Sequence, residues 1–216
     1  MRRAVSGALR AILALTIPAA AGLLVLGRPI VQALFQGGEF TARSTELVVY
    51  ALRFYTLALL SQSVLEVVVR AFAARKDTLT PLLVSFFTTA LNVGLALRLA
   101  RPIEQGGLEH GGLALANGAA VAVEASIGLA ILHRRWRGVE GRRILSDLGR
   151  AALAAGAMAG TVLLVSALSG LRGLPLLLVG GGLGAAVYFG VALLLGMREL
   201  RTIPLAVLRR SAGTQP

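Results

Sequence analysis

The residues of this sequence that are the best candidates for binding or chemistry are the charged side chains inside long apolar runs. Glu124 lies midway along such a run, between Val123 and Ala125. A carboxylate in hydrocarbon must face protein or water, be paired, or be protonated. Glu124 could therefore bind a cation or a basic group, or carry a proton. A structural hydrogen bond to a neighbouring helix would explain it equally well.

Another apolar run carries Arg53 and Glu66, which are thirteen residues apart. About 20 Å of helix would separate them, so they cannot pair with each other. Glu66 and Arg70 are four residues apart on one face, which favours a local salt bridge over a transport role. Arg53 lies near the end of its run, where its long side chain can reach the polar surface. Alternatively, Arg53 lines a cavity open to the outside and meets an anionic substrate.

Asn92 introduces an amide deep in a third apolar run. A buried amide needs partners, and hydrogen bonding to another helix is its commoner use in membranes. Thr88 and Thr89 lie four and three residues before it, on the same side of a helix. The three residues predict a modest polar stripe, open to an ion or a substrate.

The remaining inventory argues against catalysis. Cysteine is absent, aspartate occurs only at Asp77 and Asp147, and the spacing of His110 and His133 does not form a metal-binding pair. We therefore expect no enzyme, no catalytic residue, no metal site and no cofactor. A membrane enzyme acting on a lipid phosphate would need a cluster of Asp, His and Lys that this sequence lacks.

Composition predicts an integral membrane protein. Hydrophobic residues make up 56% of the 216 positions and charged residues only 15%. A soluble domain of this length has too little interior to bury so much apolar surface. The net charge of +12 could suggest nucleic acid. The arginines, however, gather between apolar runs, as at the ends of membrane helices, so we expect no nucleic-acid partner.

Six apolar runs are long enough to cross a bilayer, which takes about 20 residues. The sequence thus predicts an all-α integral membrane protein with about six transmembrane helices. These are expected at residues 11–35, 47–69, 78–97, 111–132, 151–171 and 173–197. Pro18 predicts a kink in the first helix.

The basic residues predict the orientation of these helices. Sixteen of the 22 Lys and Arg residues fall on the side that holds both chain ends, and short basic loops stay in the cytoplasm. Both termini are therefore expected to be cytoplasmic.

The chain divides into four parts on this basis. Residues 1–134 form four helices, 135–150 a basic cytoplasmic loop, 151–197 a final helix pair and 198–216 a cytoplasmic tail. The basic loop is expected to set the topology and to contact anionic membrane lipids.

Three local strings resemble one known family. They are LFQGGEFT at residues 34–41, AFAARKDTLTP at 71–81 and GLALA at 112–116. Their order and spacing resemble the MurJ/MviN family of lipid II flippases, and the similarity spans nearly the whole chain. The most specific motif comprises Arg75, Asp77, Thr78, Thr80 and Pro81. We expect it to form a structural turn with Thr80 and Pro81 as N-cap and first residue of the third helix.

The resemblance implies transport of a lipid-linked peptidoglycan precursor across the bacterial inner membrane by alternating access. It implies that the last two helices form a hydrophobic groove for the polyprenyl tail. Members of the family have about fourteen helices, and only the final six are matched here. An N-terminal half-transporter chain is therefore an expected partner.

Departures from the family bear on the candidate residues. Asn92 matches a polar position of a cation site in some members, but the oxygen ligand expected one turn later falls on Ala96. Glu124 stands where many relatives have another polar residue, and Glu66 where a basic residue is common. Two other functions stay open: a membrane scaffold that does not transport, and a lobe of a related exporter with another substrate.

Overall fold

The computed structural model describes residues 2–35, 37, 39–102, 108–136, 141–171 and 173–197. Within them the chain forms six long α-helices, each apolar and long enough to cross a membrane, which confirms the predicted all-α membrane fold. The expected tail, residues 198–216, lies outside the described residues. The helices are α1 (Arg2–Phe35), α2 (Ala42–Ala73), α3 (Leu79–Leu99), α4 (Glu109–Trp136), α5 (Gly141–Ser169) and α6 (Gly173–Leu194).

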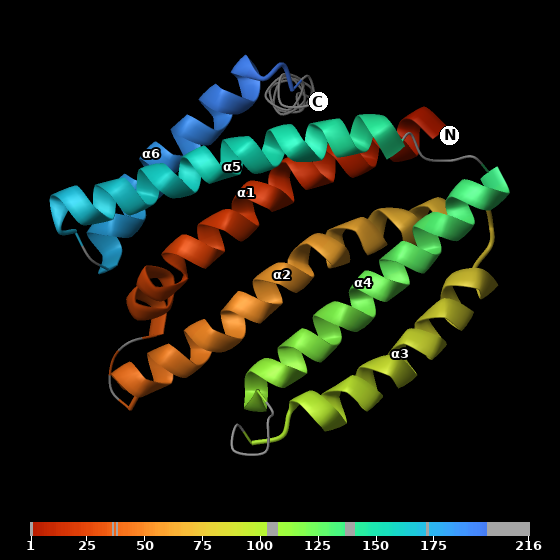
Figure 1. The fold of residues 1–216 in the computed structure, drawn as a ribbon, viewed down its shortest axis with the longest axis horizontal. Coiled ribbons are helices and arrows are strands. Elements are labelled where there is room, and N and C mark those ends of the chain that lie inside the picture. The colour runs from red at the N-terminus through yellow and green to blue at the C-terminus, as the bar shows by residue number, and fades with distance from the viewer. Residues whose placement is uncertain are drawn as a thin grey trace, which may run out of the picture.

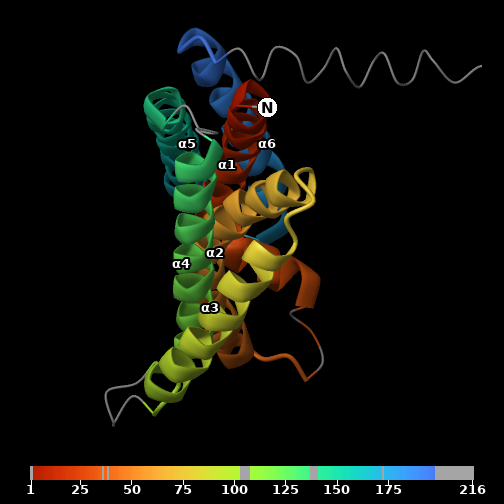
Figure 2. The same ribbon diagram turned by 90° about the vertical axis from the view of Figure 1, so that its right-hand side faces the viewer.

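The helices form a bundle whose spatial order differs from the chain order (Figure 1). α2 packs between α4 and α1, and α3 packs on the far side of α4. α5 and α6 pair with each other and pack against α1. Turning the molecule by 90° separates α3 and α4 at one end from α5 and α6 at the other (Figure 2). The consecutive helices α2 and α3 therefore touch little, and α4 bridges them.

Most helices extend beyond the apolar runs that predicted them. α4 continues to Trp136 and α5 begins at Gly141, so most of the expected loop over residues 135–150 is helical. Hydropathy marks only the part of a helix that lies in hydrocarbon, whereas arginine and leucine favour helix at the membrane surface as well. The basic stretch is thus the extended start of α5 rather than a long loop.

Small residues allow α4 to lie very close to α2. A Cβ atom added at Gly128 would come within 2.6 Å of Val68 Cγ1, and one at Gly118 within 3.0 Å of Ala58 Cβ. Small residues at membrane helix interfaces permit this close backbone approach. The α2–α4 interface is consequently closely packed.

One buried hydrogen bond adds to the apolar packing of the last helix pair on α1. Pro18 has no N–H, so the carbonyl of Ala14, four residues earlier, lacks its helical donor. The buried Tyr188 hydroxyl of α6 donates to this Ala14 oxygen at 2.5 Å. Because water is absent from a bilayer core, a carbonyl freed by proline needs such a donor. The pair α5–α6 is therefore held at the position of Pro18.

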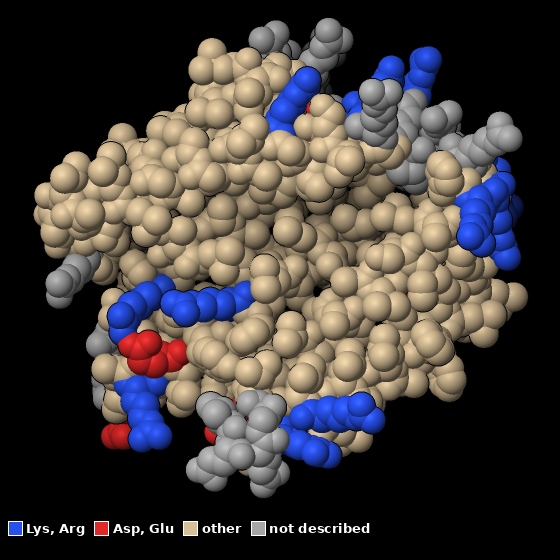
Figure 3. All heavy atoms as spheres, viewed as in Figure 1, with Lys and Arg blue, Asp and Glu red and all other residues tan. Residues whose placement is uncertain are grey.

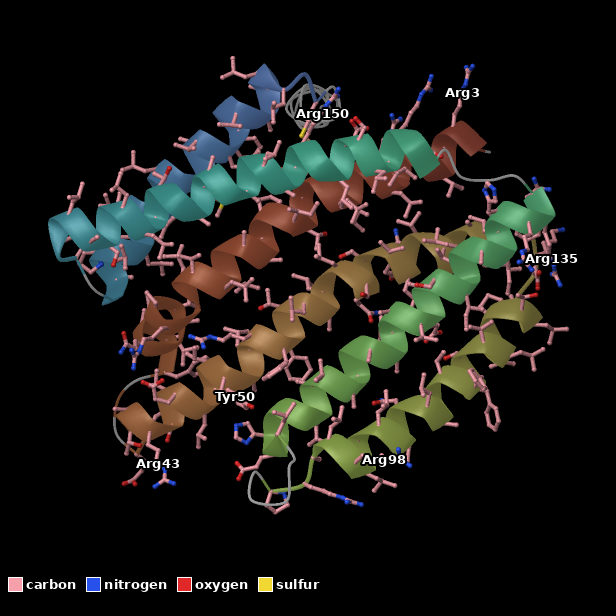
Figure 4. The ribbon with its side chains drawn as sticks, viewed as in Figure 1. Arg3, Arg43, Tyr50, Arg98, Arg135 and Arg150 are labelled. Carbon is pink, nitrogen blue, oxygen red and sulfur yellow. The ribbon has the colours of Figure 1, made fainter. Side chains whose placement is uncertain are left out.

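The two ends of the bundle carry its charges. Arg3, Arg135 and Arg150 lie at one end, whereas Arg43 and Arg98 lie at the other (Figure 4). The middle of the face in Figure 3 is largely free of charged atoms. The order of the apolar runs places Arg3, Arg135 and Arg150 on the side of both chain ends and Arg43 and Arg98 on the other side, in agreement with this separation. The positive-inside rule predicts that the end with Arg3, Arg135 and Arg150 is cytoplasmic.

Candidate functional site

Glu124 meets Thr88 in the middle of the bundle. Glu124 lies near the centre of α4 and is half-buried, while Thr88 lies near the centre of α3 and is 1% exposed. The Thr88 hydroxyl donates to Glu124 Oε2 at 2.9 Å. The intramembrane carboxylate therefore has a defined partner on a neighbouring helix.

A narrow pocket extends from Glu124 between α2, α3 and α4. Its volume is about 10 Å³, and Thr80 and Phe72 line it as well as Glu124. Thr80 belongs to the first turn of α3, and Phe72 to the last turn of α2. The pocket thus lies beside Glu124, on the side of the bundle that we predict to be cytoplasmic.

The expected polar stripe on α3 is only partly buried. Thr88 is buried, Asn92 is half-buried and Thr89 is exposed. Asn92 lies four residues after Thr88, on the side of α3 that bears the Glu124 contact. Asn92 and Thr88 therefore share a side of α3, from which Thr89 is turned away.

The two candidate residues of α2, Arg53 and Glu66, lie in different settings. Glu66 pairs with Arg70 at 3.5 Å, and both side chains are at least half exposed. This is the local salt bridge favoured by their spacing. Arg53 is exposed in the outer half of α2. It lies three and four residues before Thr56 and Leu57, and so on their side of the helix.

Thr56 and Leu57 also line the large cavity of the bundle. The cavity has a volume of about 290 Å³ and lies between α1, α2 and α5. It is almost wholly apolar, with Leu24, Leu60 and Ala155 among its walls. The face of the molecule in Figure 3 is hollowed between these helices. Arg53 therefore stands about one helical turn beyond an apolar cavity of the size of a ligand site.

The family turn forms a polar clasp between α3 and α4. The backbone N–H of Thr80 donates to Asp77 Oδ1 at 3.1 Å, and the Thr80 hydroxyl donates to Oδ2 at 2.9 Å. Arg135, near the end of α4, donates to the same Oδ2 at 3.1 Å. Trp136 stacks edge-on with Phe72 at 5.3 Å, and Arg75 lies 5.3 Å from the Trp136 ring centroid. We call these residues the clasp.

The predicted capping of α3 by Thr80 is wrong. The N-cap position is Thr78 rather than Thr80, and its side chain makes no capping hydrogen bond. The Asp77 carboxylate caps the helix instead, because it accepts from Thr80 and suits the positive helix N-terminus. Pro81 still lies in the first turn, where its missing N–H costs nothing. The turn therefore sets how α3 meets α4, more than how it meets α2.

The clasp predicts a pH response that the only tryptophan of the chain can report. The two hydrogen bonds from Thr80, followed by the charge of Arg135, hold the pKa of Asp77 below its ordinary value of 3.8. A lowered pKa in the folded state stabilises the fold above the ordinary value, and this contribution is lost as the pH falls through the lowered one. Trp136 emission should therefore stay constant down to about pH 4 and shift to the red at lower pH.

Asp77→Asn should give red-shifted Trp136 emission already at neutral pH, because the charge that orders Arg135 is gone. Arg43→Gln, at the opposite end of α2, is the control and should leave the emission unchanged. A wild-type spectrum in Asp77→Asn at neutral pH would contradict the role assigned to the carboxylate.

Several of these residues were not singled out from sequence. In the sequence, Arg135 and Trp136 stand out only as members of a basic stretch, and no short-range pattern connects them with Asp77. The sequence does contain a clue to the hydrogen bond of Tyr188, because Pro18 frees a carbonyl that requires a donor from elsewhere. In the part of the chain that the structure describes, no group of three or more His, Asp or Glu residues could hold a metal ion.

Comparison with known proteins gives one consistent result. The family model described as "Lipid II flippase MurJ" matches residues 1–179. A protein of Rhizobium meliloti (strain 1021), described as a probable lipid II flippase MurJ, is 35% identical over 211 residues, which cover 93% of this chain and 38% of the relative. A protein of Vibrio cholerae with the same description is 32% identical over 201 residues, covering 88% of this chain and 37% of the relative.

A solved structure agrees with these relatives. "Lipid II flippase MurJ, inward closed conformation" matches with a TM-score of 0.72 at 21% identity, over 92% of this chain and 39% of that one. The chain thus spans less than two fifths of the length of the proteins it matches. It belongs to the MurJ family of lipid II flippases, and it corresponds to the C-terminal portion of the longer members.

Proposed function

We propose that this chain is the C-terminal part of a lipid II flippase of the bacterial inner membrane. In the proposal, it moves a lipid-linked peptidoglycan precursor by alternating access and takes no part in catalysis. The observation that carries the proposal is the apolar cavity of about 290 Å³ between α1, α2 and α5, with Arg53 one turn beyond it, in a chain of the MurJ family.

The cavity and Arg53 match the two chemical parts of such a substrate. A polyprenyl tail is hydrocarbon and suits the apolar walls that Leu24, Leu57 and Leu60 contribute. A pyrophosphate is anionic and suits a guanidinium, which binds phosphate oxygens in a bidentate manner. The resemblance placed the tail between the last two helices. In the described residues, the cavity takes its wall from α5 and otherwise from α1 and α2.

A second portion of the transporter is part of the proposal. Alternating access requires two bodies that move around one central site, and this chain spans less than two fifths of its relatives. The first portion would be supplied as a separate N-terminal chain. Arg53, Asn92 and the Glu66–Arg70 pair would then lie on or near the surfaces that meet the substrate or that portion. Anionic lipids would contact the basic end with Arg3, Arg135 and Arg150.

Growth complementation tests this proposal. A bacterium depleted of its resident lipid II flippase would express this chain alone, or together with a separate chain holding the N-terminal portion of the Rhizobium meliloti relative. We expect rescue only when both chains are present. Arg53→Gln should reduce rescue, whereas Arg43→Gln, on the same helix but farther from the cavity, should not.

Each other outcome has a definite meaning. Rescue by this chain alone would contradict the need for an N-terminal partner. Failure of both combinations, with the protein present in the membrane, would contradict transport of this precursor. A membrane scaffold or an exporter lobe with another substrate would then take its place.

A further inference from the structure

The Glu124–Thr88 contact indicates what can bind in the membrane interior. Glu124 lines a pocket together with Thr80 and seven apolar residues, Leu65, Val68, Val69, Phe72, Pro81, Val84 and Gly128. No charged residue other than Glu124 lines this pocket among the described residues. The hydrogen bond from Thr88 is therefore the polar contact of the carboxylate in largely apolar surroundings.

Thr88 can serve both protonation states of Glu124. Its hydroxyl lies 2.9 Å from Glu124 Oε2 and 3.1 Å from the backbone oxygen of Val84. With the carboxylate charged, the hydroxyl donates to Glu124. With the carboxyl group protonated, Glu124 donates to the Thr88 oxygen, and the Thr88 proton turns to Val84. Neither state leaves a buried polar atom without a partner, so a proton can bind and leave without repacking.

The pocket is too small and too apolar for a metal cation. Its volume of about 10 Å³ corresponds to about one water molecule. Hard cations such as Ca²⁺ and Mg²⁺ need about six oxygen ligands, whereas the only residues with side-chain oxygens that line the pocket, among the described residues, are Glu124 and Thr80. The Thr80 hydroxyl donates to Asp77 instead.

Charged groups elsewhere on the packed helices are engaged or distant. On α2, Glu66 pairs with Arg70, and Arg53 lies in the outer half. At the inner end, Asp77 pairs with Arg135. Arg98 lies near the outer end of α3, and His133 and Arg134 lie in the last turn of α4. Among the described residues, Thr88 is therefore the one polar side chain that contacts the Glu124 carboxylate.

We propose that Glu124 is a proton-binding site between α3 and α4, in which the Thr88 hydroxyl is the hydrogen-bond partner of both the charged and the protonated carboxyl group. The use of the proton in transport rests on the proposed function, but its binding does not. The site can therefore be tested on the chain without any transport assay.

Carbodiimide labelling tests the site directly. Dicyclohexylcarbodiimide partitions into membranes and modifies protonated carboxyl groups, and mass spectrometry of the purified chain locates the adduct. We expect an adduct on Glu124 whose rate of formation falls as the pH rises. At a fixed pH, Thr88→Val should label about tenfold faster, because the charged form loses its donor. Thr88→Ser retains the hydroxyl and should behave as wild type.

Two controls keep the result specific. Glu66→Gln removes another carboxylate of the membrane-spanning helices and should not change labelling of Glu124. Replacing choline chloride by sodium chloride at constant pH should also have no effect. Protection by sodium would show a metal-cation site and overturn the proposal, as would a rate independent of pH or an unlabelled Glu124.

Since these readouts need no partner chain, their failure is distinguishable from a failure of growth complementation.

Discussion

Gly112→Ala should destabilise the chain by about 3 kcal/mol, because overpacking against a rigid neighbour is costly. A Cβ atom at this position would lie 2.0 Å from the Leu99 carbonyl oxygen and 2.3 Å from its carbon. Backbone atoms cannot rotate away as a flexible side chain can. The same Leu99 oxygen accepts from the backbone N–H of Leu108 at 2.7 Å, so a shift would also break the closure of the α3–α4 connection.

Thermal unfolding of the detergent-solubilised chain measures this effect, with a much lower midpoint expected for Gly112→Ala. Gly94→Ala is the matched control on α3, because nothing lies within 4 Å of its added Cβ. The control should be neutral or slightly stabilising, since alanine favours helix. Equal midpoints for Gly112→Ala and wild type would contradict the packing described for the α3–α4 connection.

Tyr188→Phe should weaken the attachment of α5 and α6 to α1. It removes the hydroxyl that donates to Ala14 and leaves a buried carbonyl without a partner, at a cost of about 1–2 kcal/mol. Hydrogen exchange of backbone amides in α6 should therefore become faster. Tyr55→Phe, which removes a half-exposed hydroxyl on α2, should leave that exchange unchanged.

A double-mutant cycle isolates the cause. Pro18→Ala restores an N–H that can donate to the Ala14 carbonyl within α1. In that background Tyr188→Phe should cost clearly less than in the wild type, which gives a positive coupling between two residues 170 positions apart. Simple additivity of the two substitutions would contradict the link between the proline and the tyrosine.

Local pattern predicted the elements better than their contacts. Every span followed from the length of its apolar run, because lipid requires each crossing segment to satisfy its own backbone hydrogen bonds. The Glu66–Arg70 pair followed from helical spacing. Hydropathy predicted the positions of the helix ends inaccurately, because the helical residues in the basic stretch before Arg150 do not form an apolar run.

Local sequence pattern could not predict the contacts between distant residues. Thr88 was recognised as part of a polar stripe, but its alignment with Glu124 depends on how α3 packs against α4. Arg135 reaches Asp77 across 58 positions of sequence. Sequence spacing fixes the face of one helix, and only the packing of two helices decides which faces meet. The clasp and the Tyr188–Ala14 bond both belong to this second level.

These contacts also suggest how the parts of the chain are connected. The α2–α4 interface is tightly packed, whereas the pair α5–α6 joins the bundle through α1. The cavity lies at this junction, between α1, α2 and α5. Movement of the helix pair relative to α2 would therefore change the shape of the proposed tail site directly.

Movement of the precursor between the two leaflets can be measured in proteoliposomes. This chain and the N-terminal portion of the Rhizobium meliloti relative would be purified separately, combined and reconstituted, and the fraction of fluorescent lipid-linked precursor that changes leaflet would be measured. We predict transfer with the two chains together, and only background transfer with either alone or with the Arg53→Gln variant in the pair. Background transfer by a correctly assembled pair would contradict the assignment of this chain as the C-terminal part of a flippase.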